Sequence, residues 1–333
     1  MPPPSVSRIT PPQSIEGGRI VIDGQGFAVD GPELPEVHVG HGAARLVSAS
    51  PSRLSAIVPA GLEAGRAPVR IAGVDGATAF IDIAAPFAAG LHQVDSPVFD
   101  RAGNLYVTFS GTRGQQVPVS IFRVTPNGTR ETFSSGIVNP TSMAIDPDDR
   151  LYVSSRFEGT VYRVAVDGSV ESYATDLGVA CGLAFAPDGT LYVGDRSGTI
   201  FRVDRAGHAE ALATLPASVA AFHLALSPDG ALYVTGPTLS SYDALYRVDP
   251  DGTVSTRHAA FGRPQGLAFD PSGTLFVVEA LAGSSGLYRV PPTGDPELVL
   301  AGPGLVGVAF DSHGLVVVAS NETAYRLPAH AAM

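Results

Sequence analysis

A short pattern returns along most of this chain at intervals of about 40 residues. Its most complete copy runs from Gly182 to Val193 and reads GLAFAPDGTLYV. The central residue of its Leu-Tyr-Val part recurs at six positions: Tyr106, Tyr152, Tyr192, Tyr233, Phe276 and Val316. A repeat of this length that holds four short β segments is typical of propeller blades. The sequence therefore predicts a six-bladed β-propeller over residues 86–333.

A second marker, aromatic-Arg-aliphatic, keeps step with the first. Its central residues are Arg123, Arg163, Arg202, Arg247, Arg289 and Arg326. A residue that is present in every repeat most simply serves the repeat itself. We therefore expect these arginines to make structural contacts within and between blades, and the repeated tyrosines to lie in the blade cores.

The loops of the predicted propeller differ between its two faces. Each repeat has two tight turns with a glycine, such as 187–189 and 167–168, and both turns belong to one face of the disc. The opposite face carries long irregular connections at 110–119, 236–244 and 279–286. Because long loops on a rigid scaffold commonly carry function, we expect the functional site on this long-loop face, around the central channel. The last repeat lacks a fourth strand, which the segment before the first repeat is expected to supply.

Residues 1–85 precede the repeats and contain five or six short β segments with turn residues between them. This spacing is typical of a β-sandwich. The segment also resembles an IPT/TIG domain, an immunoglobulin-like module, in five stretches that begin at Ile9 (ITPP), Glu16 (EGG), Ile22 (IDGQGF), Val58 (VPAGL) and Ala67 (APVRI). The resemblance implies an accessory or interaction module rather than a catalytic domain. The overall fold class is thus all-β, an N-terminal sandwich followed by a propeller.

Composition and charge exclude several function classes. The net charge of −11 makes nucleic acids and anionic membranes unsuitable partners. All 21 basic residues are arginine, so Schiff-base chemistry and a Walker A loop are excluded. The N-terminus lacks a basic-then-apolar leader, and no apolar run approaches the length of a membrane span. We expect a soluble protein that is cytoplasmic as written, or secreted if a leader was removed.

The propeller segment also resembles the NHL and SMP-30/gluconolactonase families, in the stretches that begin at Gly182 (GLAF), Pro187 (PDGTLYV) and Gly266 (GLAFDPSG). In those lactonases, residues that ring the channel bind a divalent cation that activates water or polarises the lactone. The corresponding positions here open each innermost strand: Asp95, Thr141, Cys181, Phe222, Gln265 and Val306. Only Asp95 matches an acidic ligand, for a cation such as Ca²⁺, Zn²⁺ or Mn²⁺. Cys181, Phe222 and Val306 stand where a hard cation needs oxygen ligands.

Other residues break the repeat pattern and are expected to reach the same face from the ends of second strands: Arg156, Asp195, Arg196, Glu279 and Asn321. His223 replaces the glycine of Gly-Leu-Ala-Phe. Together, Asp95, His223 and Glu279 are candidate catalytic residues that could hold a cation or pair a base with an acid. The alternative is structural, with Asp195 and Arg196 in a salt bridge and His223 bonded to a loop carbonyl.

Two further features are the rim and the single cysteine. Tyr242 and Asp243, with Arg113 and Gln115–Gln116, are expected to line the rim and suit polar or sugar-like ligands, although solvated loop tips explain them equally. Cys181 fits a small buried hydrophobe better than a nucleophile.

Three functions remain open from the sequence. The first is a binding protein that presents a site for a small polar ligand, a glycan or another protein on the long-loop face. The second is a metal-dependent lactonase or esterase that uses Asp95, His223 and Glu279. The third is a structural interaction module with a closed channel.

Overall fold

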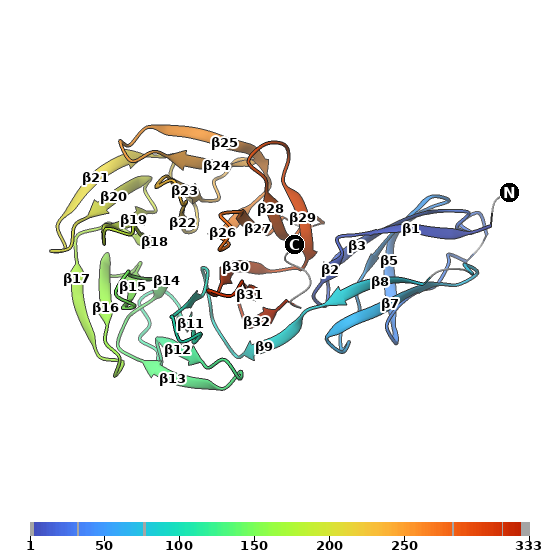
Figure 1. Ribbon diagram of the computed structural model, residues 1–333, viewed down its shortest axis with the longest axis horizontal. Coiled ribbons are helices and arrows are strands. Elements are labelled where there is room, and N and C mark those ends of the chain that lie inside the picture. The colour runs from blue at the N-terminus through green and yellow to red at the C-terminus, as the bar shows by residue number, and fades with distance from the viewer. Residues whose placement is uncertain (1–2, 32, 76–77, 282, 315, 328–333) are drawn as a thin grey trace.

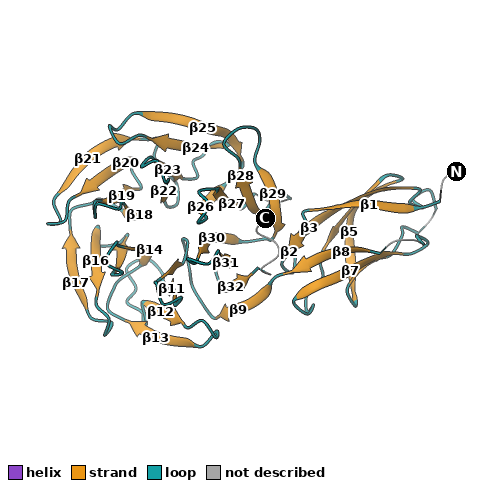
Figure 2. Ribbon diagram, in the orientation of Figure 1, coloured by secondary structure: helices purple, strands orange, loops and turns teal. Residues whose placement is uncertain are grey.

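The computed structural model describes residues 3–31, 33–75, 78–281, 283–314 and 316–327. All the secondary-structure elements assigned in these residues are β-strands, and loops connect them (Figure 2). The strands form two bodies, a disc and an elongated sandwich attached to the rim of the disc (Figure 1). The described residues include no helix that is long and apolar enough to cross a membrane.

The sandwich contains the first eight strands. Their hydrogen-bonded order is β1-β3-β6-β5-β4-β7-β8-β2, and β5 belongs to both layers because it pairs with β6 and with β4. Alternate residues of β3 point inward, so that Ile20 and Ile22 pack with Leu54, Val69 and Ile81 in a buried core. The strand bounds are β1 (Ser5–Thr10), β2 (Gln13–Ser14), β3 (Arg19–Gln25), β4 (Val37–Val39), β5 (Gly42–Ser50), β6 (Arg53–Ile57), β7 (Gly65–Ile71) and β8 (Ala79–Ile83).

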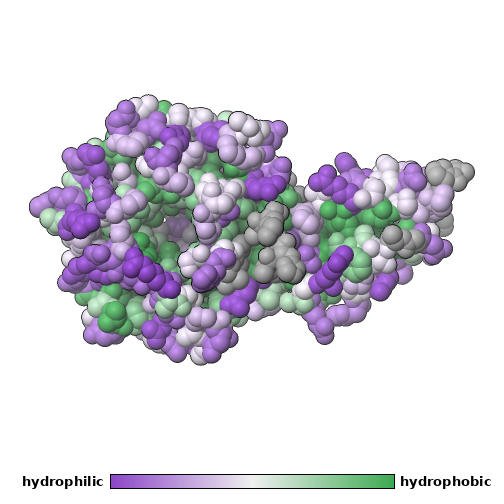
Figure 3. Space-filling model, in the orientation of Figure 1, coloured by the Kyte–Doolittle hydropathy of each residue, from purple (hydrophilic) through white to green (hydrophobic). Residues whose placement is uncertain are grey.

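The disc is a β-propeller. Five antiparallel sheets of four strands are separate from one another: β10-β11-β12-β13, β14-β15-β16-β17, β18-β19-β20-β21, β22-β23-β24-β25 and β30-β31-β32-β9. The last of these confirms the predicted ring closure, because β9 comes from the segment before the first repeat and pairs with β32. On the face shown in Figure 3, hydrophilic side chains cover most of the outer parts of the blades.

The bounds of the strands in these five sheets are β9 (Ala85–Ala89), β10 (Val98–Phe99), β11 (Leu105–Thr108), β12 (Ile121–Val124), β13 (Arg130–Ser134), β14 (Pro140–Ile145), β15 (Leu151–Ser155), β16 (Thr160–Val164), β17 (Val170–Ala174), β18 (Ala180–Phe185), β19 (Leu191–Asp195), β20 (Thr199–Val203), β21 (Ala209–Thr214), β22 (His223–Leu226), β23 (Leu232–Thr235), β24 (Asp243–Val248), β25 (Val254–Phe261), β30 (Leu305–Phe310), β31 (Val316–Ser320) and β32 (Thr323–Arg326).

The structure corrects the prediction of six separate blades, because five of the sheets stand alone. The remaining repeat forms β26 (Pro264–Phe269), β27 (Leu275–Glu279), β28 (Gly286–Val290) and β29 (Glu297–Ala301). These strands pair in the order of a blade, but they belong to a 12-stranded sheet that continues into the sandwich. The connection is the two-residue strand β2, which pairs in parallel with β8 on one side and with β29 on the other. The two bodies are therefore joined by backbone hydrogen bonds.

The repeated arginines make the predicted structural contacts. In four repeats the arginine on the third strand pairs with the glutamate directly opposite on the fourth: Arg123–Glu131, Arg163–Glu171, Arg202–Glu210 and Arg289–Glu297. Arg247 pairs instead with Asp229 and Asp249. These arginines therefore serve the blades.

Candidate functional site

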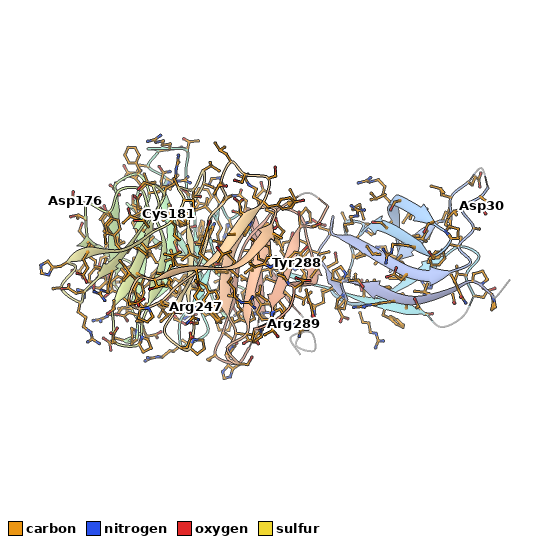
Figure 4. The ribbon with its side chains drawn as sticks, turned by 90° about the horizontal axis from the view of Figure 1, so that it is seen from above. Asp30, Asp176, Cys181, Arg247, Tyr288 and Arg289 are labelled. Atoms are coloured by element: carbon orange, nitrogen blue, oxygen red, sulfur yellow. The ribbon has the colours of Figure 1, made fainter. Side chains whose placement is uncertain are left out.

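The long-loop face of the propeller contains a cavity of about 760 Å³. Figure 4 shows the disc from its edge, with Cys181 and the loop residue Asp176 on one side and Arg247 and Arg289 on the other. The cavity is lined by residues from most of the repeats: Gln93, Val94, Arg113, Asn139, Arg156, Phe157, Val179, Arg196, Ser197, Ala217 to Ala221, Gln265, Val306 and Asn321. Of the sequence candidates, Arg113, Arg156, Arg196, Gln265, Val306 and Asn321 are thus brought together.

Two of the cavity arginines occupy equivalent positions in neighbouring repeats. Arg156 and Arg196 each follow directly after a second strand, β15 or β19. Their backbone N–H groups donate to the carbonyls of Asn139 and Val179, at 3.4 and 3.2 Å. These hydrogen bonds hold the backbone of each arginine in place and do not involve its guanidinium group.

The third cavity arginine, Arg113, lies on a loop that the buried Asn139 holds in place. The Asn139 Nδ2 group donates to the carbonyls of Gly111 and Thr112, both at 2.9 Å. Its Oδ1 accepts the N–H of Gly114 at 2.6 Å. Asn139 adopts a positive φ of 48°, a conformation that asparagine tolerates better than most residues. One side chain from the second repeat therefore positions a loop of the first.

The guanidinium groups of Arg113, Arg156 and Arg196 have no hydrogen bond or ion pair to any described residue. The alternative salt bridge between Asp195 and Arg196 is not formed. Instead, the Asp195 carboxylate accepts the N–H of Val179 at 2.7 Å and the hydroxyl of Ser197. No aspartate or glutamate is among the described residues that line the cavity.

The acidic residues at the ends of second strands anchor loops. Glu279 is 3% exposed, and its carboxylate accepts backbone N–H groups from Gly262, Arg263 and Leu281, each at 2.7 Å. Asp195 does the same at the end of β19. Asp195 and Glu279 differ from the residues at the same position in other repeats, but both use a carboxylate to bind the backbone of a neighbouring loop.

Ser155 and Ser320 end the second strands of two other repeats, and they accept backbone N–H groups in the same way. The position at the end of the second strand therefore serves the loop that follows it, whether the residue is an acid or a serine.

Asp95 and His223 form a buried pair in the channel. The Nδ1 atom of His223 lies 2.6 Å from Oδ1 of Asp95, and the side chains are 1% and 4% exposed. The N–H of Ser96 donates to the same oxygen at 2.6 Å. Asp95 lines a second cavity of about 360 Å³ at the opposite, tight-turn end of the channel. The long-loop cavity and the Asp95–His223 pair are therefore separate features.

The predicted catalytic trio is not assembled, because Glu279 uses its carboxylate on three backbone amides. Among the described residues, no group of three or more His, Cys, Asp or Glu side chains could hold a metal ion. The channel ring offers one carboxylate, Asp95, and that group already binds His223 and Ser96. The residues present therefore do not fit the divalent cation that the lactonase resemblance implies.

Three of the ring residues, Thr141, Cys181 and Phe222, do not line the long-loop cavity. The Thr141 hydroxyl donates to the carbonyl of Asn139 at 3.1 Å and is buried. Cys181 is 1% exposed, and burial raises the pKa of its thiol to about 12, so it is neutral at ordinary pH. The ring of Phe222 packs among core residues such as Val234 and is not among the residues that line the cavity. Of the six ring positions, Gln265 and Val306 thus line the long-loop cavity.

Two of the predicted rim residues, Tyr242 and Asp243, do not line the cavity. Tyr242 is 64% exposed. Asp243 is buried and accepts the N–H and the hydroxyl of Thr238. Gln115 accepts the N–H of Thr112 and so stabilises the loop that carries Arg113.

Sequence reasoning missed Gln93, Asn139 and the 217–221 loop. Gln93 is fully buried, and its Oε1 atom has no hydrogen-bond partner among the described residues. Its Nε2 group donates to the carbonyl of Asp95, and its own carbonyl accepts from Asn321 at 2.9 Å. Gln93 precedes the first repeat, so a comparison of repeats gave no signal for it.

Comparison with known proteins supports both parts of the fold. Residues 4–82 match the model of the IPT/TIG domain family, which confirms the resemblance seen in the sequence. No curated protein matches the chain. The resemblance to the NHL family stays a prediction.

Solved structures resemble the chain in fold. An auxiliary nutrient binding protein from Bacteroides thetaiotaomicron has 15% identity, a TM-score of 0.59 and 97% coverage of both chains. A putative gluconolactonase has 19% identity and a TM-score of 0.59, over 73% of this chain and 91% of its own. A gluconolactonase from Xanthomonas campestris has 18% identity and a TM-score of 0.57, over 72% of this chain and 89% of its own. The protein therefore consists of an N-terminal IPT/TIG domain and a β-propeller with gluconolactonase-like structural neighbours.

Proposed function

We propose that this protein is a binding protein that takes a small polar ligand into the long-loop cavity. The observation that carries the proposal is the cavity itself, a space of about 760 Å³ at the mouth of the channel. This volume lies within the range of small-molecule sites, about 300–1,000 Å³. Polar groups that converge on an otherwise apolar wall give such a site its orientation and specificity.

The support structure of the cavity favours a preformed site. Asn139 makes three hydrogen bonds to the loop that carries Arg113. On the other side, the N–H of Ser218 donates to the carbonyl of Arg196 at 3.0 Å, and the Ser218 hydroxyl donates to Pro237 at 3.0 Å. Because the walls of the cavity are already ordered, little of the binding free energy is lost in ordering them when a ligand binds. The auxiliary nutrient binding protein, whose fold spans both parts of this chain, is consistent with a binding role.

We further propose that the domain boundary lies after residue 85, at the start of β9, and that β26–β29 act as the sixth blade. The strands β26–β29 have the pairing order of the five separate blades. On this view the ring around the channel has six members, and one of them is extended by the sandwich. The sandwich then acts as a fixed accessory module.

Calorimetric titration with D-glucose, D-gluconate, L-serine and glycerol 3-phosphate tests the binding function. The matched variants are Ala220→Trp, which fills the cavity, and Ala206→Trp, which lies on an exposed turn outside it. We expect at least one compound to bind the unmodified protein and Ala206→Trp equally, and Ala220→Trp much more weakly. Equal binding to both variants, or binding of no compound at millimolar concentration, contradicts the proposal.

A metal-free hydrolase is the second candidate, and one observation favours it. His223 presents Nδ1 to Asp95, while its Nε2 atom is buried and has no partner among the described residues. This is the arrangement in which a carboxylate orients a general base. The side chain is 1% exposed, so a substrate reaches Nε2 only if the surrounding chain opens. Ester and lactone hydrolysis by the unmodified protein that is lost in His223→Gln supports this candidate, and no hydrolysis removes it.

A further inference from the structure

We propose that the ligand of the long-loop cavity is a small organic anion, a carboxylate or phosphate on a short carbon body, whose negative charge is held by Arg113, Arg156 and Arg196. The inference rests on the proposed binding function and names the class of ligand. Guanidinium groups match the planar oxygens of carboxylates and phosphates and bind them with paired, charge-assisted hydrogen bonds.

The first argument is that these arginines are unpaired where most arginines of the propeller are paired. Four of the third-strand arginines face a glutamate, as Arg123 faces Glu131 at 2.7 Å, and Arg247 pairs with two aspartates. Arg101, Arg130, Arg205 and Arg257 instead donate to backbone carbonyls. Arg113, Arg156 and Arg196 make no such contact to a described residue, yet all three line one cavity. Their guanidinium donors are therefore available to a ligand.

The second argument comes from the repeats. In three repeats the residue directly after the second strand donates its backbone N–H to the residue directly before the innermost strand. These donors are Arg156, Arg196 and Ala280, at 3.4, 3.2 and 3.1 Å. In the first repeat the donor is Ser110, two residues after β11, which donates to the carbonyl of His92 at 3.1 Å. The fold accepts a serine or an alanine as this donor, so it does not require arginine. Arginine in two neighbouring repeats is instead explained by what the cavity binds.

The third argument is the charge of the walls. The chain carries a net charge of −11, yet none of the described cavity-lining residues is acidic. The nearby carboxylate of Asp195 points to the backbone N–H of Val179 and the hydroxyl of Ser197. Three positive groups on a partly enclosed wall create a local potential that attracts anions in spite of the overall charge.

The other walls define the rest of the ligand. Val94, Phe157, Val179 and Val306 give the cavity an apolar side that suits a carbon body. The combined features describe a small organic anion with an apolar carbon body.

Calorimetric titration with matched probes tests the inference. Mandelate carries a carboxylate, a ring and a hydroxyl; phenylacetate lacks the hydroxyl; phenyl phosphate replaces the carboxylate; benzyl alcohol is neutral; inorganic phosphate has no carbon body. Each probe is measured at low salt and at ~0.15 M salt, because screening weakens charge-dependent binding. The variants are Arg156→Gln and Arg196→Gln, and Arg45→Gln on the exposed face of the sandwich is the control for loss of one charge.

We expect at least one organic anion to bind, more weakly at the higher salt, and benzyl alcohol not to bind. Arg156→Gln and Arg196→Gln should each weaken anion binding by about 10- to 100-fold, while Arg45→Gln leaves it unchanged. Preference for carboxylate or for phosphate probes identifies the charged group. Neutral ligands that bind as well as anions, with no effect of the arginine variants, overturn the inference but leave the binding function intact. Binding of no probe, charged or neutral, overturns both.

Discussion

The imidazole of His223 and the carboxylate of Asp95 meet at the centre of the propeller, with Nδ1 2.6 Å from Oδ1, although 128 residues separate them in sequence. Asp95 comes from the segment that enters the first repeat, and His223 opens β22. Both side chains are almost fully buried. A buried polar pair of this kind depends on both partners, because either one alone is left without its hydrogen bond in a poorly solvated place.

Replacement of His223 by alanine is expected to destabilise the fold strongly. The change leaves the Asp95 carboxylate buried with only the Ser96 N–H as a hydrogen-bond donor. We expect the free energy of unfolding to fall by about 3–5 kcal/mol, measured by urea denaturation. His208→Ala is the matched control, since His208 also pairs with an aspartate, Asp204, but on the surface. Equal stability of the two variants would show that the buried pair is not structurally important.

Replacement of Glu279 by alanine should free the loop that it anchors. The carboxylate accepts the N–H groups of Gly262, Arg263 and Leu281, and the variant leaves these donors without their acceptor. We expect a loss of roughly 2–4 kcal/mol in stability and faster hydrogen exchange at these three amides. Glu297→Ala, which removes only an exposed partner of Arg289, is the control. Unchanged exchange at residues 262 and 281 would contradict the anchoring role.

The sequence predicted the repeat architecture well because a blade is a local structure. Its four strands follow one another in the chain, so the period of Tyr152, Tyr192 and their equivalents reveals it. The junction between the bodies depends on a different kind of contact. Gln13 pairs with Leu300 and with Asp82, and such a short strand with distant partners leaves no periodic signal. The number of separate blades was therefore not predictable.

The candidate site was predictable only in part, because the amino-acid type of a residue that departs from the repeat does not reveal whether it lines the cavity or anchors a loop. Departure from the repeat pattern selected Arg156 and Arg196, which line the cavity, but also Asp195 and Glu279, which hold loops. An aspartate, a glutamate and a serine can each accept a backbone N–H, so the same role appears as three different residues. Asn139 was missed for the opposite reason. Its hydrogen-bond partners at 111, 112 and 114 belong to another repeat and could not be assigned before the fold was known.

The rigid junction between the bodies can be tested at Gly18. A Cβ atom there would lie 2.1 Å from Oγ of Ser14 and 2.5 Å from the carbonyl oxygen of Ala301, closer than packing allows. We expect Gly18→Val to displace β2 and to separate thermal unfolding into two transitions in calorimetry, where the unmodified protein shows one. Gly31→Val, on an open part of the sandwich, should unfold as the unmodified protein does. A single transition in Gly18→Val would mean that the two bodies do not rely on β2.

The thiol of Cys181 should be unreactive in the folded protein and should make stability depend on alkaline pH. Burial raises the pKa of this thiol to about 12 from an ordinary value of 9.0, so the folded state keeps a proton that the unfolded chain loses above pH 9.0. Stability is therefore unaffected by Cys181 below pH 9.0 and falls as the pH rises toward 12, by about 1.4 kcal/mol per pH unit.

Cys181→Ala should remove this part of the alkaline slope, while Tyr106 and Tyr162, whose pKa values are also raised to about 12, remain in both proteins. Urea denaturation of the two proteins at several alkaline pH values measures the difference. At neutral pH we expect iodoacetamide to label Cys181 slowly in the folded protein and rapidly in urea. Rapid labelling of the folded protein would show that the thiol is accessible, and it would return Cys181 to the candidate nucleophiles of the channel.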